Sequence, residues 1–567
     1  MAILESDAVE KTNTTTLKLK RIQLLILFLS ISLVGWCQQL EVISPSTFLA
    51  GKAFPVVVEA TMQNELDLFR SENMSVSISG GEEVSGILKL KKGRSMTTFR
   101  ANQSANTLSI SGQGISISVS PNSSQEELHT GAIAGTETWQ AGTVHRISSD
   151  LQINVNDSLI IEQGCWVILD SAVNILVEGV LDARGVRSNP IVFCSNGSAS
   201  WGGIVSVQGV VDLKYCLLNN AGGDHTRNYG HSGSQPVLKT ESGYVQAIHT
   251  FIFDCIGKAL GGDGGNLEFK QGGISRCDTG GEFGGTVVLV SASHIIDIPD
   301  DDGILEDDDN DGLYFSGFTN QPSIVDSCVF MNGEDDAIDH NNAVLEVRNT
   351  WVENFENEGI AASNGNSVLI YNSLFKNCEQ GIEAGYGSPQ VTVNHCVMVD
   401  NDNGLRFGDW YNWGCTGSIT CTNSIMYNNL DNVYNYDVLT DGPVVNAIDL
   451  TFSITNDLEY DANTGCIAGT PNFTNRYQLE LGSVGIATAN DGLNMGLISP
   501  ITTGIQNPLR ESNSSIQSVR IFDLNGKLII AEKWFNQSVL NNLPNGIYIV
   551  EQNHGSYLKR VKKAVVR

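Results

Sequence analysis

Basic residues are scarce in this sequence. Its 567 residues include 33 Lys and Arg against 63 Asp and Glu, which gives a formal net charge of −30. Proteins that bind nucleic acids need clustered Lys and Arg to contact phosphates, so the imbalance excludes that class of partner. A chain this acidic is suited to neutral or basic surfaces and to divalent cations.

Long hydrophobic runs are also missing. The most apolar stretch, residues 22–36, is shorter than the roughly 20 residues of a transmembrane helix and follows Lys18, Lys20 and Arg21. A basic flank before a short apolar run is typical of a secretory signal peptide. We therefore predict that residues 1–37 are a signal peptide and that the rest of the chain has no stable membrane span. An uncleaved anchor is the alternative.

Cysteine motifs that hold metals are absent, since the sequence has no CxxC pair and no His/Cys cluster to suggest zinc. Cys415 and Cys421 lie close enough in the chain to form a disulfide. Cys216, Cys328 and Cys396 share a register, to within about one residue, in the repeats described below. This indicates small stacked residues near a core.

A strong β pattern is present instead. Residues 38–120 alternate apolar and polar side chains between Gly and Asn turns, which predicts a small β-sandwich. The segment resembles bacterial immunoglobulin-like domains. Residues 121–141 begin with a stretch rich in Ser, Gln and Glu, and we predict a linker there.

From residue 142 to residue 495 the chain repeats itself. Aliphatic residues recur 25, 22, 22 and 23 positions apart at Leu313, Ile338, Ile360, Ile382 and Leu405. Polar markers keep the same period at Asp326, Asn349, Asn372, Asn394 and Asn423. A period near 22 with short β-rich pieces indicates a β-solenoid.

These repeats, with the opening strands near Leu159, Val180 and Ile191, resemble the right-handed parallel β-helix superfamily that includes pectate lyases and polygalacturonases. The predicted fold is therefore all-β. A right-handed parallel β-helix solenoid is flanked by an N-terminal immunoglobulin-like module and a C-terminal small β-sandwich. The superfamily holds hydrolases, lyases, epimerases and inert adhesins, so the resemblance implies no single activity.

The last segment, residues 511–567, has a different pattern. Residues 519–527 and 543–550 each contain the Asn-Gly pair typical of hairpin turns, and the end is basic. The order and position of these elements resemble the type IX secretion sorting domain, preceded by a linker over residues 496–510. The resemblance implies export through Sec and then through the type IX secretion machinery, with release or attachment at the outer cell surface.

Equivalent residues of successive coils stack about 4.8 Å apart, so each repeat position becomes a column. Because strand side chains alternate, the position after the inward aliphatic column faces outward. It holds Tyr314, Asp339, Ala361, Glu383 and Arg406. Asp339 and Glu383 are two coils apart, about 9.6 Å, near the upper limit for the carboxylate pair of an inverting glycosidase.

Residues 333–340, which read Gly-Glu-Asp-Asp-Ala-Ile-Asp-His, are the best catalytic candidate. They resemble the G-D-D element of polygalacturonases, whose aspartates activate water and protonate the leaving oxygen, although the N-T-D and R-I-K elements are missing. We predict a catalytic set of Asp335, Asp336, Asp339, Glu383 and Arg406 in a polysaccharide lyase or a glycoside hydrolase. A solvated turn edge is the alternative.

The densest acidic stretch is residues 297–311, with nine acids in fifteen positions. A D-x-D-x-D-G motif is made there by Asp307, Asp309, Asp311 and Gly312. Carboxylates at this spacing converge on calcium, and the glycine permits a sharp turn. Phe318 takes the place of the closing glutamate, so further ligands must come from residues 300–302 or 335–336. We predict Ca²⁺ as a structural cofactor; a solvated acidic loop is the alternative.

Aromatic residues cluster just after Arg406. Trp410, Tyr411 and Trp413 are suited to stacking on sugar rings, although a buried aromatic plug would have the same composition. We predict a substrate-binding set of these three residues with Tyr314 and His340. Residues 223–232 break the coil period and are predicted to form a projecting loop.

The sequence thus predicts a secreted or cell-surface monomer that binds acidic polysaccharide with calcium, as an enzyme that cleaves it or without catalysis. The alternative function is a non-catalytic surface adhesin or a structural solenoid.

Overall fold

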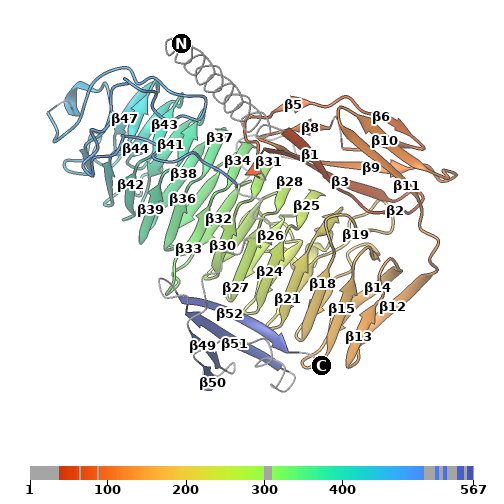
Figure 1. Ribbon diagram of the computed structural model, residues 1–567. Coiled ribbons are helices and arrows are strands. Elements are labelled where there is room, and N and C mark those ends of the chain that lie inside the picture. Colours follow the sequence, from red (N-terminus) through yellow and green to blue (C-terminus); the bar gives the residue numbers. More distant parts are fainter. Residues whose placement is uncertain are drawn as a thin grey trace, which may run out of the picture.

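A computed structural model describes residues 38–62, 65–85, 88–298, 309–460 and 462–503, and four strands between residues 518 and 565 (Figure 1). The predicted signal peptide and Asp307 lie outside the described residues. Within the described ranges, helical structure is limited to two 3-10 turns, η1 (His225–Arg227) and η2 (Leu458–Tyr460). No helix in this part of the chain is long and apolar enough to cross a membrane.

The N-terminal module contains two main sheets. The first has the order β1 (Gln38–Ile43), β3 (Ala53–Met62), β9 (Arg94–Ala101) and β7 (Gly81–Glu83), with β4 (Glu65–Leu66) on β3. The second has the order β2 (Thr47–Phe48), β11 (Ile115–Pro121), β10 (Leu108–Gly112) and β6 (Ser77–Ser79), and β5 (Glu72–Asn73) pairs with β8 (Lys89–Leu90). Phe54, Phe99 and Ile110 are buried in a core that both sheets share.

The remainder of the chain to residue 451 is a parallel β-helix, as the repeats predict. Each coil contributes one strand to each of three faces, and each strand pairs in parallel with its counterparts in the neighbouring coils. Two long strands, β12 (Glu126–Ile133) and β14 (Val144–Ile153), start the first two faces.

The first face, called the covered face here, contains β16 (Trp166–Leu169), β19 (Ile191–Ser195), β22 (Cys216–Asn219), β25 (Phe251–Cys255), β28 (Gly273–Cys277), β31 (His294–Ile298), β34 (Val329–Gly333), β37 (Trp351–Phe355), β40 (Leu374–Lys376), β43 (Val397–Val399) and β46 (Ile425–Tyr427). The second face contains β17 (Ile175–Val177), β20 (Ile204–Val207), β23 (Leu238–Glu241), β26 (Leu260–Asp263), β29 (Gly281–Gly284), β32 (Leu313–Ser316), β35 (Ile338–Asn341), β38 (Glu358–Ser363), β41 (Gln380–Ala384), β44 (Asn403–Phe407) and β47 (Asp431–Asn435). The third face contains β13 (Thr136–Trp139), β15 (Ser158–Glu162), β18 (Val180–Arg184), β21 (Val210–Lys214), β24 (Tyr244–Ile248), β27 (Asn266–Lys270), β30 (Val287–Ser291), β33 (Ser323–Asp326), β36 (Leu345–Arg348), β39 (Ser367–Tyr371), β42 (Gln390–Asn394), β45 (Ser418–Thr422) and β48 (Ile448–Thr451).

The aliphatic column forms as predicted. Leu313 pairs with Ile338, and Ile382 pairs with Leu405, and all four side chains are fully buried. The glycine before this column is required by the closeness of the coils. A Cβ on Gly312 would lie 2.4 Å from the Ala337 carbonyl oxygen. Gly312 therefore allows close packing between coils. The calcium-loop motif predicted instead that this glycine permits a sharp turn.

Asparagines of the polar marker stack at the corner between the third and covered faces. Asn349 and Asn372 have left-handed backbone conformations, with φ of 51° and 46°. The Asn372 Nδ2 donates to Asn349 Oδ1 at 2.8 Å, and the Asn349 Nδ2 donates to Asp326 Oδ1 at 2.9 Å. We call the stack of Asp326, Asn349 and Asn372 the asparagine ladder. It satisfies buried amides with one another from coil to coil.

The predicted linker over residues 121–141 is wrong, because β12 and β13 form the first coil there. These strands pair in parallel with β14 and β15, so the solenoid begins before residue 142. The Ser- and Glu-rich composition that predicted a linker belongs to the exposed side of an edge strand; Glu126, Glu127 and Leu128 are exposed.

The N-terminal module lies against the covered face, beside β25, β28 and β31 (Figure 1). Arg94 is buried at this contact, where it pairs with Glu59 at 2.7 Å and donates to the Gly272 carbonyl at 2.5 Å. Ile43, Met96 and other module residues share a hydrophobic cluster with Phe251.

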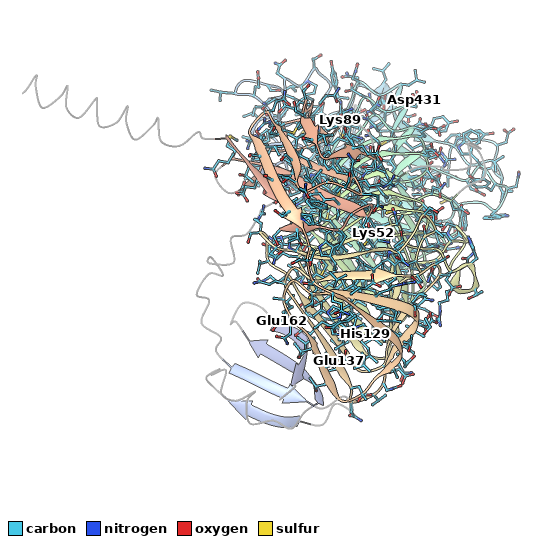
Figure 2. All side chains as sticks on the ribbon, turned by 90° about the vertical axis from the view of Figure 1, so that its right-hand side faces the viewer. Lys52, Lys89, His129, Glu137, Glu162 and Asp431 are labelled. Atoms are coloured by element: carbon cyan, nitrogen blue, oxygen red, sulfur yellow. The ribbon has the colours of Figure 1, made fainter. Side chains whose placement is uncertain are left out.

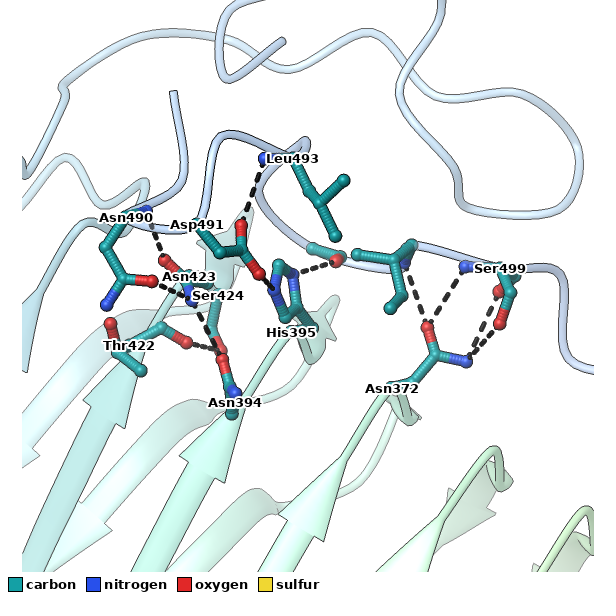
Figure 3. Close-up of polar contacts among 12 residues, drawn as sticks. Asn372, Asn394, His395, Thr422, Asn423, Ser424, Asn490, Asp491, Leu493 and Ser499 are labelled. Carbon is teal, nitrogen blue, oxygen red and sulfur yellow. Dashed lines mark hydrogen bonds and ion pairs between the residues drawn. The ribbon is translucent and has the colours of Figure 1, made fainter. Parts of the chain in front are cut away.

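A C-terminal strap, residues 477–503, packs on the rest of the covered face (Figure 3). Asn372 accepts hydrogen bonds from the Ile498 and Ser499 backbone nitrogens, and His395 contacts Asp491 at 2.9 Å. Met495, Leu497 and Ile501 are buried against the solenoid. The first part of the predicted 496–510 linker is therefore packed structure.

The C-terminal strands form one antiparallel sheet in the order β50 (Leu528–Glu532), β49 (Ser518–Phe522), β51 (Gly546–Asn553) and β52 (Leu558–Val565). The predicted turns at residues 525–526 and 545 lie outside the described residues.

Candidate functional site

The outward column of the second face forms in the predicted register. Tyr314 on β32 pairs with Asp339 on β35, and Glu383 on β41 pairs with Arg406 on β44. Glu282 on β29 extends the column by one coil beside Tyr314. The strands therefore hold a row of polar side chains on the outer surface of the solenoid.

A loop between β22 and β23 folds over this row, where the broken period of residues 223–232 predicts a projecting loop. The His231 backbone nitrogen donates to Glu282 Oε1 at 2.8 Å, and Glu282 forms a buried ion pair with Lys258. The Tyr229 hydroxyl donates to the Gly262 carbonyl at 2.6 Å. These contacts place the His231 ring edge-on to Tyr314, with ring centroids 4.1 Å apart.

Five aspartates gather beside His231, and we call them the acid cluster: Asp309, Asp311, Asp335, Asp336 and Asp339. His231 Nδ1 lies 2.8 Å from Asp309 Oδ2. Ligand atoms of His231, Asp311 and Asp339 all lie within 4.8 Å of one another, and so do those of Asp311, Asp335 and Asp336.

Four of the five aspartates in the acid cluster hold protons more tightly than isolated aspartates do. Burial raises the pKa of Asp339 to about 8 and that of Asp335 to about 6, and neighbouring carboxylates add to both shifts. Burial and adjacent acids also raise the pKa values of Asp311 and Asp336.

The Asp309–His231 pair behaves in the opposite way. The hydrogen bond between them lowers the pKa of Asp309 and raises the pKa of His231, which favours the charged pair. Asp339 thus combines a pKa of about 8 with a position within 4.8 Å of His231. A carboxyl group with a pKa near the working pH is suited to general acid catalysis.

The same oxygens fit a hard cation. Three carboxylates with oxygens within 4.8 Å of one another can share an ion that binds oxygens at about 2.3–2.6 Å. Asp335 and Asp336, one of the two sources that the sequence offers for the missing ligands, lie beside Asp311 across one coil. Asp309 is instead bonded to His231, and Asp307 lies outside the described residues.

Two predicted catalytic residues stand apart from the acid cluster. Glu383 forms an ion pair with Arg406, whose side chain is only 2% exposed and stacks over Trp410 with 5.1 Å to the ring centroid. Ala361 separates Glu383 from Asp339 in the column. The Glu383–Arg406 pair lies under the aromatic loop, and Arg406 has two buried nitrogens, Nε and Nη2, without a protein partner.

The prediction that His340 binds substrate is wrong. Its side chain is buried inside the solenoid, and Nε2 lies 2.6 Å from the Ala343 carbonyl oxygen. The reason is strand alternation: Ile338 points inward and Asp339 outward, so His340 must point inward again.

The aromatic prediction is resolved in favour of exposure. Trp410, Tyr411 and Trp413 are 50%, 72% and 66% exposed. Their loop is fixed by the buried Asp409 carboxylate, which accepts hydrogen bonds from the backbone nitrogens of Tyr411, Trp413 and Gly414. Tyr386 packs edge-on against Trp413, with centroids 4.6 Å apart. We call the exposed rings of Trp410, Tyr411 and Trp413 the aromatic platform.

The aromatic platform feels the charge of the acid cluster. Burial and the carboxylates of Glu358, Asp336 and Asp335 raise the pKa of Tyr411.

The sequence did not predict that Lys258 pairs with Glu282, that Glu358 lies beside Asp336, or that His231 contacts Asp309. Lys258 and Glu282 carry no motif and meet through coil stacking. The broken period at residues 223–232 marked the loop but did not show which acid His231 would contact. Residues 275–282 lie mostly in β28 and β29, and Arg276 pairs with Asp254 at 2.6 Å.

A comparison with solved structures found a likeness to the A-module of the mannuronan C-5 epimerase AlgE4 from Azotobacter vinelandii. The identity is 10% over 59% of this chain and 89% of that module, with a TM-score of 0.24. A comparison with curated proteins found no match.

Residues 501–567 match the family model of the secretion system C-terminal sorting domain. The match starts ten residues before the predicted boundary at 511 and overlaps the last residues of the strap. The chain therefore carries a type IX secretion sorting domain and is exported to the cell surface or beyond it.

Proposed function

We propose that this protein binds an acidic polysaccharide along the second face of the solenoid and cleaves it at the acid cluster. The observation that carries the proposal is the place of Asp339, within 4.8 Å of His231, the partner of Asp309, where burial raises the pKa of Asp339 to about 8. A glycosidic oxygen leaves only when it is protonated, and a carboxyl that stays protonated at neutral pH supplies that proton.

The other cluster members have complementary roles in this proposal. Asp311 and Asp335, when ionised, are placed to activate water or to stabilise positive charge on the sugar. Calcium bound by Asp311, Asp335 and Asp336 would contact a uronate carboxylate, which offsets the repulsion between an acidic glycan and an acidic site. The aromatic platform supplies ring faces for sugar stacking.

Glu383 and Arg406 are assigned a positioning role. Their ion pair and the stacking of Arg406 on Trp410 support the aromatic loop, and neither side chain contacts the acid cluster through any recorded hydrogen bond among the described residues.

The test is an assay of the secreted protein against a panel of acidic polysaccharides, with calcium and with a chelator. We expect new reducing ends from one substrate class and a loss of about 10²–10⁴-fold in rate for Asp339→Asn. Asp449→Asn, an exposed acid on the third face, is the control and should keep full activity. Ultraviolet absorbance from unsaturated ends distinguishes a lyase from a hydrolase.

A second candidate is a non-catalytic glycan-binding solenoid, favoured by the aromatic platform, which needs no acid to bind sugar. Binding of a glycan without products across the panel, unchanged in Asp339→Asn, would establish this function and refute the enzyme.

A further inference from the structure

The open N-terminal end of the solenoid carries two histidines and a glutamate in contact. Glu127 and His129 lie on β12 and His145 lies on β14, in the first coils. Figure 2 labels His129 and Glu137 at this end of the solenoid. Ligand atoms of the three side chains all lie within 4.8 Å of one another. His129 Nε2 is 2.9 Å from His145 Nδ1, and Glu127 Oε2 is 3.7 Å from His145 Nδ1.

The contacts of Thr143 favour one tautomer of His145. When the Thr143 hydroxyl donates its only proton to the Gln140 carbonyl at 2.5 Å, it accepts from His145 Nε2, 2.7 Å away. In this arrangement Nε2 carries the proton of the neutral ring, and the Nδ1 lone pair faces His129.

His129 has a second proton acceptor behind it. Its Nδ1 lies 3.7 Å from Glu137 Oε1, which also accepts a hydrogen bond from the Trp139 indole at 2.7 Å. Moving the His129 proton from Nε2 to Nδ1 directs it toward Glu137 and leaves Nε2 bare. Each histidine then has an outer partner for its remaining N–H, as metal-ligating histidines usually do.

The surroundings keep the two rings in place. The Trp139 ring stacks on His145 with centroids 4.1 Å apart and an interplanar angle of 8°. Trp139 and His145 are buried, whereas Glu127 is exposed and can adjust its position.

We propose that Glu127, His129 and His145 form a binding site for a transition-metal dication, with Zn²⁺ as the reference ion. Nitrogens bound to tetrahedral zinc at about 2.0–2.1 Å lie about 3.3 Å apart, so the two rings need to separate by a few tenths of an ångström. The exposed Glu127 carboxylate, now 3.7 Å from His145 Nδ1, needs to move by a similar amount to bind the ion. Water would take the fourth coordination position. Two imidazoles select such ions over calcium and magnesium.

The consequence is a clip at the end of the solenoid. β12 is the terminal strand of the covered and second faces, and a metal held by β12 and β14 would tie this edge to the next coil. A bound ion stabilises the folded state by mass action, so zinc should raise the unfolding temperature of the first coils.

No cysteine or histidine motif in the sequence indicates this site. His129 and His145 are 16 residues apart, and they meet because one coil of the parallel β-helix brings β12 beside β14.

The experiment is titration of the secreted protein with Zn²⁺ alone by calorimetry, repeated with Co²⁺ to detect nitrogen coordination in the visible spectrum. We expect at least a 100-fold loss of zinc affinity in His129→Ala and a 10–100-fold loss in Thr143→Val, which removes the partner of His145 Nε2. Glu126→Gln, at the neighbouring position on the same strand, is the control and should bind as the wild type does.

His231→Ala provides the discriminating comparison, because His231, Asp311 and Asp339 also form a group that can hold a metal. Zinc binding that survives in His231→Ala and is lost in His129→Ala supports the proposal. Zinc binding lost only in His231→Ala, or absent from the wild type, overturns it. Equal unfolding temperatures of wild type and His129→Ala without metal establish that the variant folds.

Discussion

Two corners of the solenoid are built on the same spacing but have opposite chemistry. In the asparagine ladder, each amide donates to the oxygen one coil away at 2.8–2.9 Å. In the acid cluster, carboxylates stack across coils in the same way, but carboxylate oxygens have no proton to donate. Repulsion and burial there appear as raised pKa values.

Asparagine and aspartate differ only in an NH₂ group that replaces an oxygen. This difference makes the asparagine ladder a structural corner and the acid cluster a reactive one. In the asparagine ladder, the amides are satisfied by one another and, at Asn372, by the strap. The acid cluster is satisfied only by protons, by a cation or by a substrate, and these compete with one another.

The largest expected effect is on the pH dependence of cleavage. If protonated Asp339 is the general acid, the rate falls by up to tenfold per pH unit above its pKa of about 8, or about 50-fold between pH 8 and pH 10. The measurement is kcat/KM against pH on the substrate found in the panel. A flat alkaline limb would exclude Asp339 as the acid, and Asp449→Asn should follow the wild-type curve.

The next largest effect is expected when a carboxylate, as in the acid cluster, is placed in the asparagine ladder. Asn372→Asp places a buried carboxylate in the asparagine ladder, 2.8 Å from Asn349 Oδ1, and removes the donor to Ser499. We expect a loss of about 2–4 kcal/mol in the free energy of unfolding, measured by denaturant titration at pH 7. Asn366→Asp changes a half-buried amide with a similar partner, Asn342, and should cost less than about 1 kcal/mol. Equal losses in both variants would contradict the importance of burial.

The reverse conversion is Asp336→Asn. Burial and Glu358 raise the pKa of Asp336 in the folded state, so its favourable contribution is complete below about pH 4 and is lost as pH rises through the folded value. The wild type should therefore lose stability as pH rises above about 4, and the variant should lose less. Thermal melts across this range measure the difference.

Calcium sharpens the same test. If the cation binds the ionised cluster, adding calcium raises the melting temperature of the wild type by several degrees at pH 8 and much less at pH 5. In Asp336→Asn the calcium effect should shrink. Coincident melts with calcium and with chelator at pH 8 would show that the acid cluster is not a calcium site.

The smallest effect is expected at the aromatic platform. Trp413→Ala removes an exposed ring that packs on Tyr386 and should weaken glycan binding by about 0.5–1.5 kcal/mol without changing stability. Calorimetric titration with an oligosaccharide of the cleaved type measures the loss. Leu481→Ala, an exposed apolar residue on the strap, is the control; an equal loss there would remove the specific role of the platform.

The repetitive part of the fold was predictable because each coil repeats one pattern. The aliphatic column at Leu313, Ile338 and Leu405 sets the register, and that register places Tyr314 beside Asp339. The same alternation puts His340 inside the solenoid. The prediction that His340 binds substrate was wrong because it assigned the whole motif at residues 333–340 to the surface, although the periodicity already placed His340 inside.

The covering of the solenoid was not predictable, because it depends on surfaces without sequence periodicity. Arg94 meets Gly272 across 178 positions of the chain, and His231 meets Asp309 through a loop of irregular length. The strap was assigned partly to a linker because its anchors, such as Ser499 on Asn372, are single polar contacts that no pattern marks.

The strap also determines how force enters the molecule. A pull on the chain beyond residue 503, where the sorting domain follows, acts first on the buried Ile501 and on the Ser499–Asn372 hydrogen bonds. The strap crosses several coils, so these contacts must open one after another before β48 carries load. The strap thereby protects the final coil from force that is applied to the sorting domain.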